Sequence, residues 1–179
     1  MTETGFTECI NLLRQGDMQG LAPIYREYGK LVYSAALSVC GSPDTAEDIL
    51  SEFFLRFKKA ADVYRSGVGH KKWLMISARN LAVDYLRKNR RDIPSSEDKK
   101  FTEEAENTDT EEKVTGQVNV EQMLAALSEA ERETVNLKVY CGFTLSEIAD
   151  IMHVPIGTAA WRYSSGIKKL KKLYGEAQV

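Results

Sequence analysis

The stretch that decides the fold is residues 127–172, LSEAERETVNLKVYCGFTLSEIADIMHVPIGTAAWRYSSGIKKLKK. In two places a hydroxyl residue precedes a glutamate by three positions: Ser128 before Glu131, and Thr144 before Glu147. This spacing is typical of a capping box, in which the two side chains satisfy free backbone N–H groups at the start of a helix. The pattern therefore predicts two helix starts within this stretch.

Both helices have recognisable ends, and a third helix follows them. Gly142 ends the first helix, and the break His153-Val154-Pro155 ends the second. The third helix is expected over residues 156–173 and finishes in lysines. Two helices joined by a tight turn, the second of them ending in lysines, predict a helix-turn-helix. An αα-hairpin without any role in DNA binding is the alternative.

The last helix has an apolar side and an outward side. The residues expected to point inward are Ile156, Ala159, Tyr163, Gly166 and Leu170. The outward side is the predicted major-groove surface, because side chains near the start of a recognition helix reach base edges. It carries Thr158, Trp161, Arg162 and Ser165, and a basic cluster with Lys168, Lys169, Lys171 and Lys172 follows.

The N-terminal half also has a helical pattern. A short amphipathic helix is expected over residues 6–16, and residues 18–39 carry apolar side chains at spacings of three and four, which indicates a buried helix. After a Gly-Ser-Pro turn, a further helix starts near Asp44. Opposite its apolar stripe it carries Asp48, Glu52, Leu55 and Arg56. A leucine among charges favours a docking surface, and a solvated face with an incidental Glu52–Arg56 pair is the alternative.

A basic helix follows within residues 71–91. Its inward stripe is Leu74, Ala78, Leu81 and Tyr85, and the opposite face carries Trp73, Ser77, Asn80, Asp84, Arg87 and Arg91. Arginine binds phosphate, an amide can pair with a base edge, and an aromatic ring can stack on bases. This face therefore suits nucleic acid, unless Trp73 lies in the core and the arginines are merely solvated.

Charge is distributed unevenly and suggests domain boundaries. The formal net charge is −2, but residues 92–118 hold nine Asp/Glu against three Lys/Arg and almost no large apolar residue. Such a segment buries too little surface to offset its ordering entropy, so we expect an acidic flexible linker, although a solvated helix is the alternative. The predicted organisation is all-α, with helical domains over residues 1–91 and 119–179, the second opening with a short helix over 119–127.

Several protein classes are excluded. No run approaches about 18 apolar residues, so no transmembrane helix is expected. The first residues lack the charged start and apolar run of a signal peptide, which makes the cytoplasm the expected location. Three distant cysteines and no Cys-x-x-Cys pair argue against disulfides and metal knuckles. Without a nucleophile–base set, metal cluster or phosphate loop, we expect neither an enzyme nor a cofactor.

Three stretches resemble bacterial RNA polymerase sigma factors of the extracytoplasmic-function (ECF) group. DTAEDILSEFFLRF (44–57) is similar to the family's polymerase-clamp-binding helix, and WLMISARNLAVDYLRKNRR (73–91) to its minus-ten-reading helix. Residues 127–172 are similar to its minus-thirty-five-reading domain. The resemblance implies a factor that binds core polymerase and promoter DNA and promotes strand melting. It also implies the β′ clamp helices, the β flap and an anti-sigma protein as partners.

The resemblance also implies roles for individual residues. Contacts with the β′ clamp helices fall to Asp48, Glu52, Leu55 and Arg56. Contacts with the melted minus-ten strand and its phosphates fall to Arg65, Lys71, Lys72, Trp73, Arg79, Asn80, Asp84, Arg87 and Lys88. Contacts with the minus-thirty-five duplex fall to Thr158, Ala160, Trp161, Arg162, Ser165, Lys168 and Lys169.

The recognition helix departs from the family pattern. Ala160 replaces the usual lysine, Trp161 the usual serine, and His153 a common turn glycine. Fewer basic residues imply fewer phosphate contacts and a smaller salt dependence. Two other functions compete with the resemblance: a helix-turn-helix regulator that binds a palindromic duplex without polymerase, and a helical adaptor without any nucleic-acid role.

Overall fold

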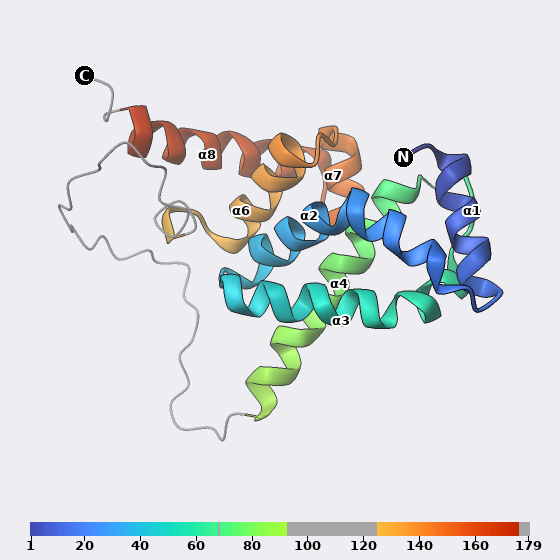
Figure 1. The fold of residues 1–179 in the computed structure, drawn as a ribbon. Helices are drawn as coiled ribbons and strands as arrows, with labels where there is room; N and C mark the ends of the chain where they lie inside the picture. Colours follow the sequence, from blue (N-terminus) through green and yellow to red (C-terminus); the bar gives the residue numbers. More distant parts are fainter. Residues whose placement is uncertain (68, 93–124, 176–179) are drawn as a thin grey trace.

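The computed structural model describes residues 1–67, 69–92 and 125–175. Over these ranges all regular structure is helical (Figure 1), which confirms the predicted all-α class. The elements are α1 (Glu3–Arg14), the short 3-10 turn η1 (Met18–Gly20), α2 (Leu21–Cys40), α3 (Pro43–Val63), α4 (His70–Asp92), α6 (Glu129–Val135), the π-helical turn η2 (Asn136–Tyr140), α7 (Leu145–Met152) and α8 (Ile156–Gly175).

Side-chain caps fix where these helices begin. Both predicted capping boxes are present: the Glu131 and Glu147 amides donate to the Ser128 and Thr144 hydroxyls, and each glutamate accepts from the backbone N–H of its cap residue. Ser42 caps α3 in the same position, accepting from the backbone N–H three residues later at 3.4 Å. These local bonds satisfy donors that a helix start leaves free, so the short-range sequence pattern is sufficient to place the helix starts.

The N-terminal helices pack around an aromatic and aliphatic core. Helices α2, α3 and α4 lie against one another, and α1 covers one end (Figure 1). The side chains of Phe6, Ile24, Val32, Phe57 and Leu74 are completely buried. Burial of each such side chain stabilises the fold by about 1.5–3 kcal/mol. The second half of α4 packs one side, with Ala82, against α2 and α3, and its last turns project from this body (Figure 1).

The C-terminal helices form the predicted helix-turn-helix. Helix α8 packs closely on α6 at Gly166, where a Cβ atom would lie only 2.8 Å from Val135 Cγ2. The turn before α8 contains His153 in the left-handed region with φ 54°. The apolar pattern predicts Ile156 to point inward, but it is 56% exposed, whereas Ala159 in the same first turn is completely buried. The expectation for Ile156 is therefore wrong: the side of this turn that packs inward is the one that carries Ala159.

The two halves share one continuous hydrophobic core. Met75 of α4 and Cys141 and Phe143 after η2 are buried together, and the sulfur atoms of Met75 and Cys141 are 4.0 Å apart. Helix α2 also packs on α6 and η2. The expected acidic linker lies outside the described residues except at its start, as does most of the helix expected over 119–127. The proposed domain boundaries therefore remain a sequence-based prediction.

Candidate functional site

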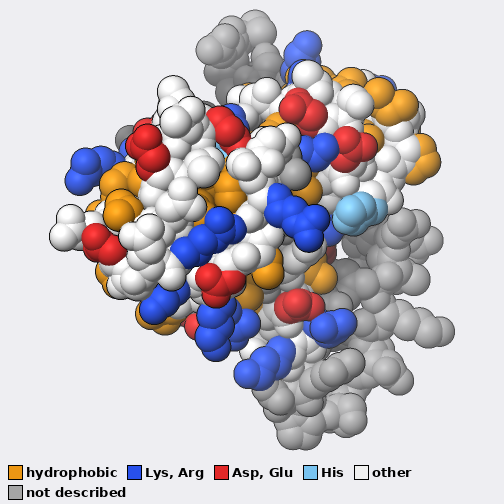
Figure 2. Space-filling view, turned by 90° about the vertical axis from the view of Figure 1, so that its right-hand side faces the viewer, with side chains coloured by type: hydrophobic (Ala, Val, Ile, Leu, Met, Phe, Trp, Pro, Cys, Tyr) orange, Lys and Arg blue, Asp and Glu red, His pale blue; other side chains and the backbone are white. Residues whose placement is uncertain are grey.

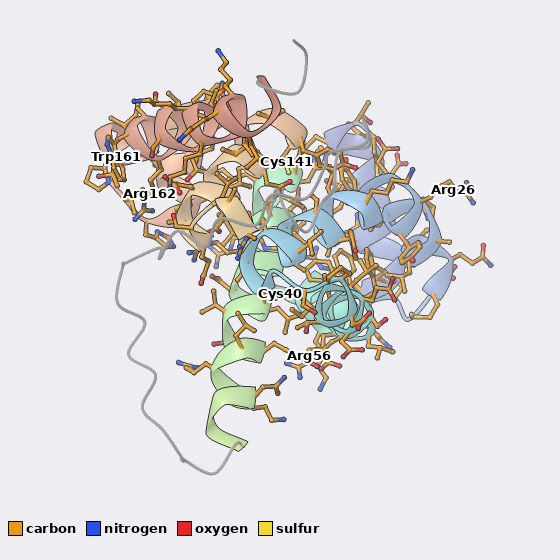
Figure 3. All side chains as sticks on the ribbon, turned by 90° about the vertical axis from the view of Figure 1, so that its left-hand side faces the viewer. Arg26, Cys40, Arg56, Cys141, Trp161 and Arg162 are labelled. Atoms are coloured by element: carbon orange, nitrogen blue, oxygen red, sulfur yellow. The ribbon has the colours of Figure 1, made fainter. Side chains whose placement is uncertain are left out.

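The outward face of α3 is open and mixed in charge. Leu55 is 79% exposed, and Arg56 forms the expected ion pair with Glu52, four residues earlier. Asp48 lies on the exposed surface and accepts a hydrogen bond from the Tyr85 hydroxyl at 3.2 Å. A projecting leucine flanked by both signs of charge is suited to docking on a protein surface. Figure 3 shows Arg56 on the side of the molecule opposite α8.

The projecting half of α4 presents polar and basic side chains. Asn80, Asp84, Arg87 and Lys88 are all exposed, and Asp84 pairs with Arg87 at 2.9 Å. Arg65, in the loop before α4, is also exposed. The structure thus keeps these five predicted minus-ten residues accessible. Two cations with an amide and a carboxylate on one projecting helix provide both phosphate-binding and base-reading groups.

The first half of α4 is instead occupied by the C-terminal half of the chain. Lys71 donates to the carbonyl of Cys141, and its ammonium lies 5.3 Å from the centre of the Phe143 ring. Lys72 pairs with Asp150 at 2.7 Å. These two lysines, predicted to contact the minus-ten strand, therefore contact the C-terminal half of the chain, unlike the exposed residues farther along α4.

Arg79 forms the most buried of these contacts, an ion pair with Glu133 of α6. Burial raises the pKa of Glu133, and the neighbouring Arg79 guanidinium opposes that rise. A buried charge that loses its partner is strongly destabilising, so replacing either residue alone would disfavour the contact between α4 and α6. Sequence patterns could not identify this partner, since 54 positions separate the two residues.

The position of Trp73 corrects the expectation that its ring lies on the open face. The ring packs edge-on against Phe57 and Tyr64, with centroid distances of 5.9 and 5.0 Å, and against Phe6 at 6.3 Å. Trp73 therefore packs against the core, which was the alternative to a place on the nucleic-acid-binding face. The reason is that α1 and α3 converge on the start of α4 and cover this ring.

The start of α8 forms the second exposed face. Trp161 is 66% exposed, and Arg162 beside it is half-buried (Figure 3). Thr158 and Ala160 are half-buried on the first turns, and Lys168 is exposed farther along. An aromatic ring and a guanidinium next to each other at the start of a helix can contact a base edge or a thymine methyl group.

Two predicted members of this face bind a buried carboxylate of α6. The Ser165 hydroxyl donates to Glu131 at 2.6 Å, and Lys169 donates to the same carboxylate at 2.8 Å. Burial alone would raise the pKa of Glu131, but hydrogen bonds from Lys169, Ser165 and Ser128 lower it to about 2. The outward placement of Ser165 is therefore wrong, because a buried carboxylate on α6 binds its hydroxyl.

Arg132 is a structural contact that sequence reasoning missed. Its guanidinium donates from α6 to the carbonyls of Ser38 and Val39 at the end of α2, at 2.8 and 3.5 Å. The last carbonyls of a helix lack partners within the helix and favour a cation. No sequence signal marks this contact, since backbone carbonyls have no residue identity.

Basic side chains also gather on the side of the molecule that carries α1. Figure 2 shows lysine and arginine side chains across the centre and lower part of this face, with some carboxylates between them. Among the described residues no group of three or more His, Cys, Asp or Glu is arranged to hold a metal ion. No helix in the described ranges is long and apolar enough to cross a membrane.

Comparison with known families assigns both halves of the chain. Residues 24–92 match the family described as Sigma-70 region 2, and residues 117–170 match Sigma-70, region 4. The first match covers α2, α3 and α4, and the second covers α6 through most of α8. Helix α1 lies before both.

Relatives resemble the chain over most of their length. It is 26% identical over 174 residues to the ECF RNA polymerase sigma factor SigW of Bacillus subtilis, covering 91% of this chain and 93% of that protein. It is also 26% identical over 150 residues to the ECF RNA polymerase sigma factor SigL of Mycobacterium tuberculosis, covering 83% and 85%.

Two solved structures resemble the fold. The sigma factor RpoE in complex with the anti-sigma factor NepR, from Bartonella quintana, has a TM-score of 0.66 at 25% identity, covering 84% of this chain and 94% of that one. CnrH in complex with the cytosolic domain of CnrY has a TM-score of 0.66 at 17% identity, covering 98% and 99%, which shows the fold alone.

Proposed function

The chain belongs to the extracytoplasmic-function group of RNA polymerase sigma factors, and we propose how its surfaces divide the work of transcription initiation. The outward face of α3, with Asp48, Glu52, Leu55 and Arg56, docks on the clamp helices of the polymerase β′ subunit. What supports this assignment is the unusually exposed Leu55, which no neighbouring helix covers. An apolar side chain of this size gains most when a partner protein removes it from water.

The projecting half of α4 receives the minus-ten element. Asn80, Asp84, Arg87 and Lys88 are accessible there, and Arg65 adds a cation from the preceding loop. Lys71, Lys72 and Arg79 join them once their contacts with the C-terminal half are released. We assign Trp73 to supporting the loop from within, since its ring packs against three aromatic side chains.

The start of α8 reads the minus-thirty-five duplex. Trp161 and Arg162 are the best-placed readers, with Thr158 and Ala160 lining the approach and Lys168 binding phosphate. We assign Ser165 and Lys169 to holding α8 against α6 through Glu131. The β flap of polymerase would hold this domain at the correct distance from the minus-ten element.

An anti-sigma protein would control the chain. The solved relative RpoE is bound to the anti-sigma factor NepR, and this chain resembles it over most of its length. As an initiation factor working with polymerase in the cytoplasm, the chain needs neither a cofactor nor an active site of its own.

The observation that carries this proposal is that one chain matches both Sigma-70 region 2 and Sigma-70, region 4. Run-off transcription with purified core polymerase tests it. We expect promoter-dependent transcripts only when the chain is added. A conventional helix-turn-helix regulator would instead bind a palindromic duplex without polymerase and produce no transcript.

A further inference from the structure

Helix α1 lies outside the region matched to the family, yet it holds the loop that leads into α4. The carboxylate of Glu3, the first residue of α1, reaches both ends of that loop. Its Oε1 accepts a hydrogen bond from the Tyr64 hydroxyl and one from the Gly67 amide at 3.3 Å. Its Oε2 accepts from the His70 amide at 3.3 Å and from His70 Nδ1. One side chain therefore joins the end of α3, the loop and the first residue of α4.

His70 is fixed from two further directions. Because a carboxylate can only accept, the Nδ1 that faces Glu3 carries a proton. Nε2 on the other side of the ring lies 2.6 Å from the Tyr28 hydroxyl of α2. The Phe6 ring of α1 stacks on the imidazole at 4.9 Å between centroids, with the planes 24° apart. Side chains of two helices, α1 and α2, thus determine the position of the residue at which α4 begins.

The loop needs such an anchor. Gly67 and Gly69 both have positive φ, at 88° and 79°. Glycine at these positions permits the turn but loses more conformational freedom on ordering than any other residue. Hydrogen bonds from Tyr64 and His70 lower the pKa of Glu3 to about 2, so this anchor is charged at neutral pH. Hydrogen bonds to a charged acceptor are stronger than neutral ones.

The side chains that hold the loop lie on its buried side and leave its other side exposed. Arg65, Ser66, Gly67 and Gly69 are exposed, whereas Tyr64 and Phe6 are buried. The cations Lys71 and Lys72 follow on α4, where they contact Cys141 and Asp150 in the free chain. A DNA strand arriving here would therefore meet backbone that Glu3 already holds at Gly67 and His70, and preorganisation of this kind reduces the entropic cost of binding.

We propose that Glu3 is a positioning residue for minus-ten recognition, which holds the loop between α3 and α4 in its strand-binding conformation before DNA arrives. The proposal rests on the proposed function, since it presumes that this loop meets the melted strand. Glu3 itself does not touch DNA in this account. It acts through Tyr64, Gly67 and His70, so the N-terminal helix becomes part of the promoter-reading apparatus.

The test compares Glu3→Gln with Glu8→Gln, an exposed acid on the same helix, in complex with core polymerase. The probe is a single-stranded oligonucleotide that spans the minus-ten element of a promoter found by run-off transcription. We expect Glu3→Gln to bind the strand about tenfold more weakly, since hydrogen bonds to a charged group are lost, and Glu8→Gln to bind as wild type. Tyr64→Phe, which removes one donor, should weaken binding in the same direction by less.

Two further readouts separate positioning from general stability. The core-polymerase affinity of Glu3→Gln should stay close to wild type, while amide hydrogen exchange should accelerate within residues 65–70 more than in the buried helices. Equal strand binding by wild type and Glu3→Gln would overturn the proposal while leaving the proposed function intact. A loss of strand binding that only matches an equal loss of core affinity would also overturn it. If wild-type holoenzyme fails to bind the strand, the proposed function fails and this inference with it.

Discussion

Arg162 and the lysines after it are expected to make different contributions to DNA binding. Arg162 stands beside exposed Trp161 at the start of α8, whereas Lys171 and Lys172 are exposed near its end. A bidentate arginine–guanine contact contributes about 1–3 kcal/mol of discrimination, and a lysine–phosphate contact contributes almost none. We therefore expect Arg162→Ala to relax sequence preference in the minus-thirty-five element, and the double change of Lys171 and Lys172 to Ala to weaken binding to every sequence.

Titration of promoter and scrambled duplexes with the holoenzyme at several salt concentrations measures both effects. The double lysine variant should also show a flatter salt dependence, because fewer counterions are released. Should Arg162→Ala lose affinity equally for both duplexes, Arg162 is a backbone contact and base reading belongs to Trp161 and Thr158.

Glu131 is expected to make the fold sensitive to acid. Its pKa in the folded protein is about 2, below the usual 4.5, so ionised Glu131 stabilises the fold fully above about pH 4.5. This stabilisation is lost as the pH falls from there toward 2. Because Glu131 is buried and binds Ser165 and Lys169, Glu131→Gln should lower the free energy of unfolding by about 2 kcal/mol at pH 7.

Urea unfolding at pH 7 and at successively lower pH measures this difference. The gap between wild type and Glu131→Gln should narrow on acidification, while Glu129→Gln, which changes an exposed acid on the same helix, should follow wild type. A gap that stays constant with pH would show that the charge of Glu131 does not contribute.

At the scale of one element, α3 uses one face for core packing and the opposite face for the proposed docking on polymerase. Its buried face holds Phe53 and Phe57 in the core, while Asp48, Glu52 and Leu55 lie on the other side. Changing both Asp48 and Glu52 to Lys should therefore weaken core-polymerase binding about tenfold or more, because the new lysines would repel like charges on the clamp helices. The helicity of the chain should be unchanged. Surface changes of this kind usually shift stability within about 0.5 kcal/mol.

Glu8→Lys with Glu129→Lys is the matched control, since it makes the same change of net charge at exposed sites on α1 and α6, away from α3. Binding of each variant to labelled core polymerase is compared, with circular dichroism as the check on folding. Wild-type affinity in the α3 variant would remove the docking assignment from this face.

At the scale of the whole molecule, polar contacts hold the two halves together and occupy predicted DNA-binding residues. Arg79 binds Glu133, Lys72 binds Asp150, and Arg132 binds the end of α2. Loss of hydrogen bonds to charged groups costs about 1.5–3 kcal/mol each. Arg132→Ala combined with Glu133→Gln should therefore shift the free chain toward a more extended form.

Small-angle scattering of the free chain measures this shift as a larger radius of gyration. Glu129→Gln, on the same helix, should leave the radius unchanged. The double variant should also bind a single-stranded minus-ten oligonucleotide more tightly, because Arg79 is released. A radius equal to that of wild type would mean that the shared hydrophobic core around Met75 and Phe143 holds the halves together without these contacts.

The short-range sequence pattern alone determined most of the helical framework. The hydroxyl–glutamate spacings at 128–131 and 144–147 fix two helix starts, because each capping bond closes within one turn. The same holds for the outward face of α3, where periodicity places Leu55 opposite Phe53 and Phe57. Contacts between residues three or four positions apart can be predicted because helix geometry alone brings them together.

Only the tertiary structure decided which neighbour covers each face. Periodicity gives the direction of Trp73 and Ser165 around their own helix axes, but it does not say that α1 covers the first or that Glu131 binds the second. The bonds from His70 to Glu3 and from Arg79 to Glu133 join residues 67 and 54 positions apart. Such pairs form because burial of apolar surface brings whole helices together, and no local spacing in the chain records which helices will meet.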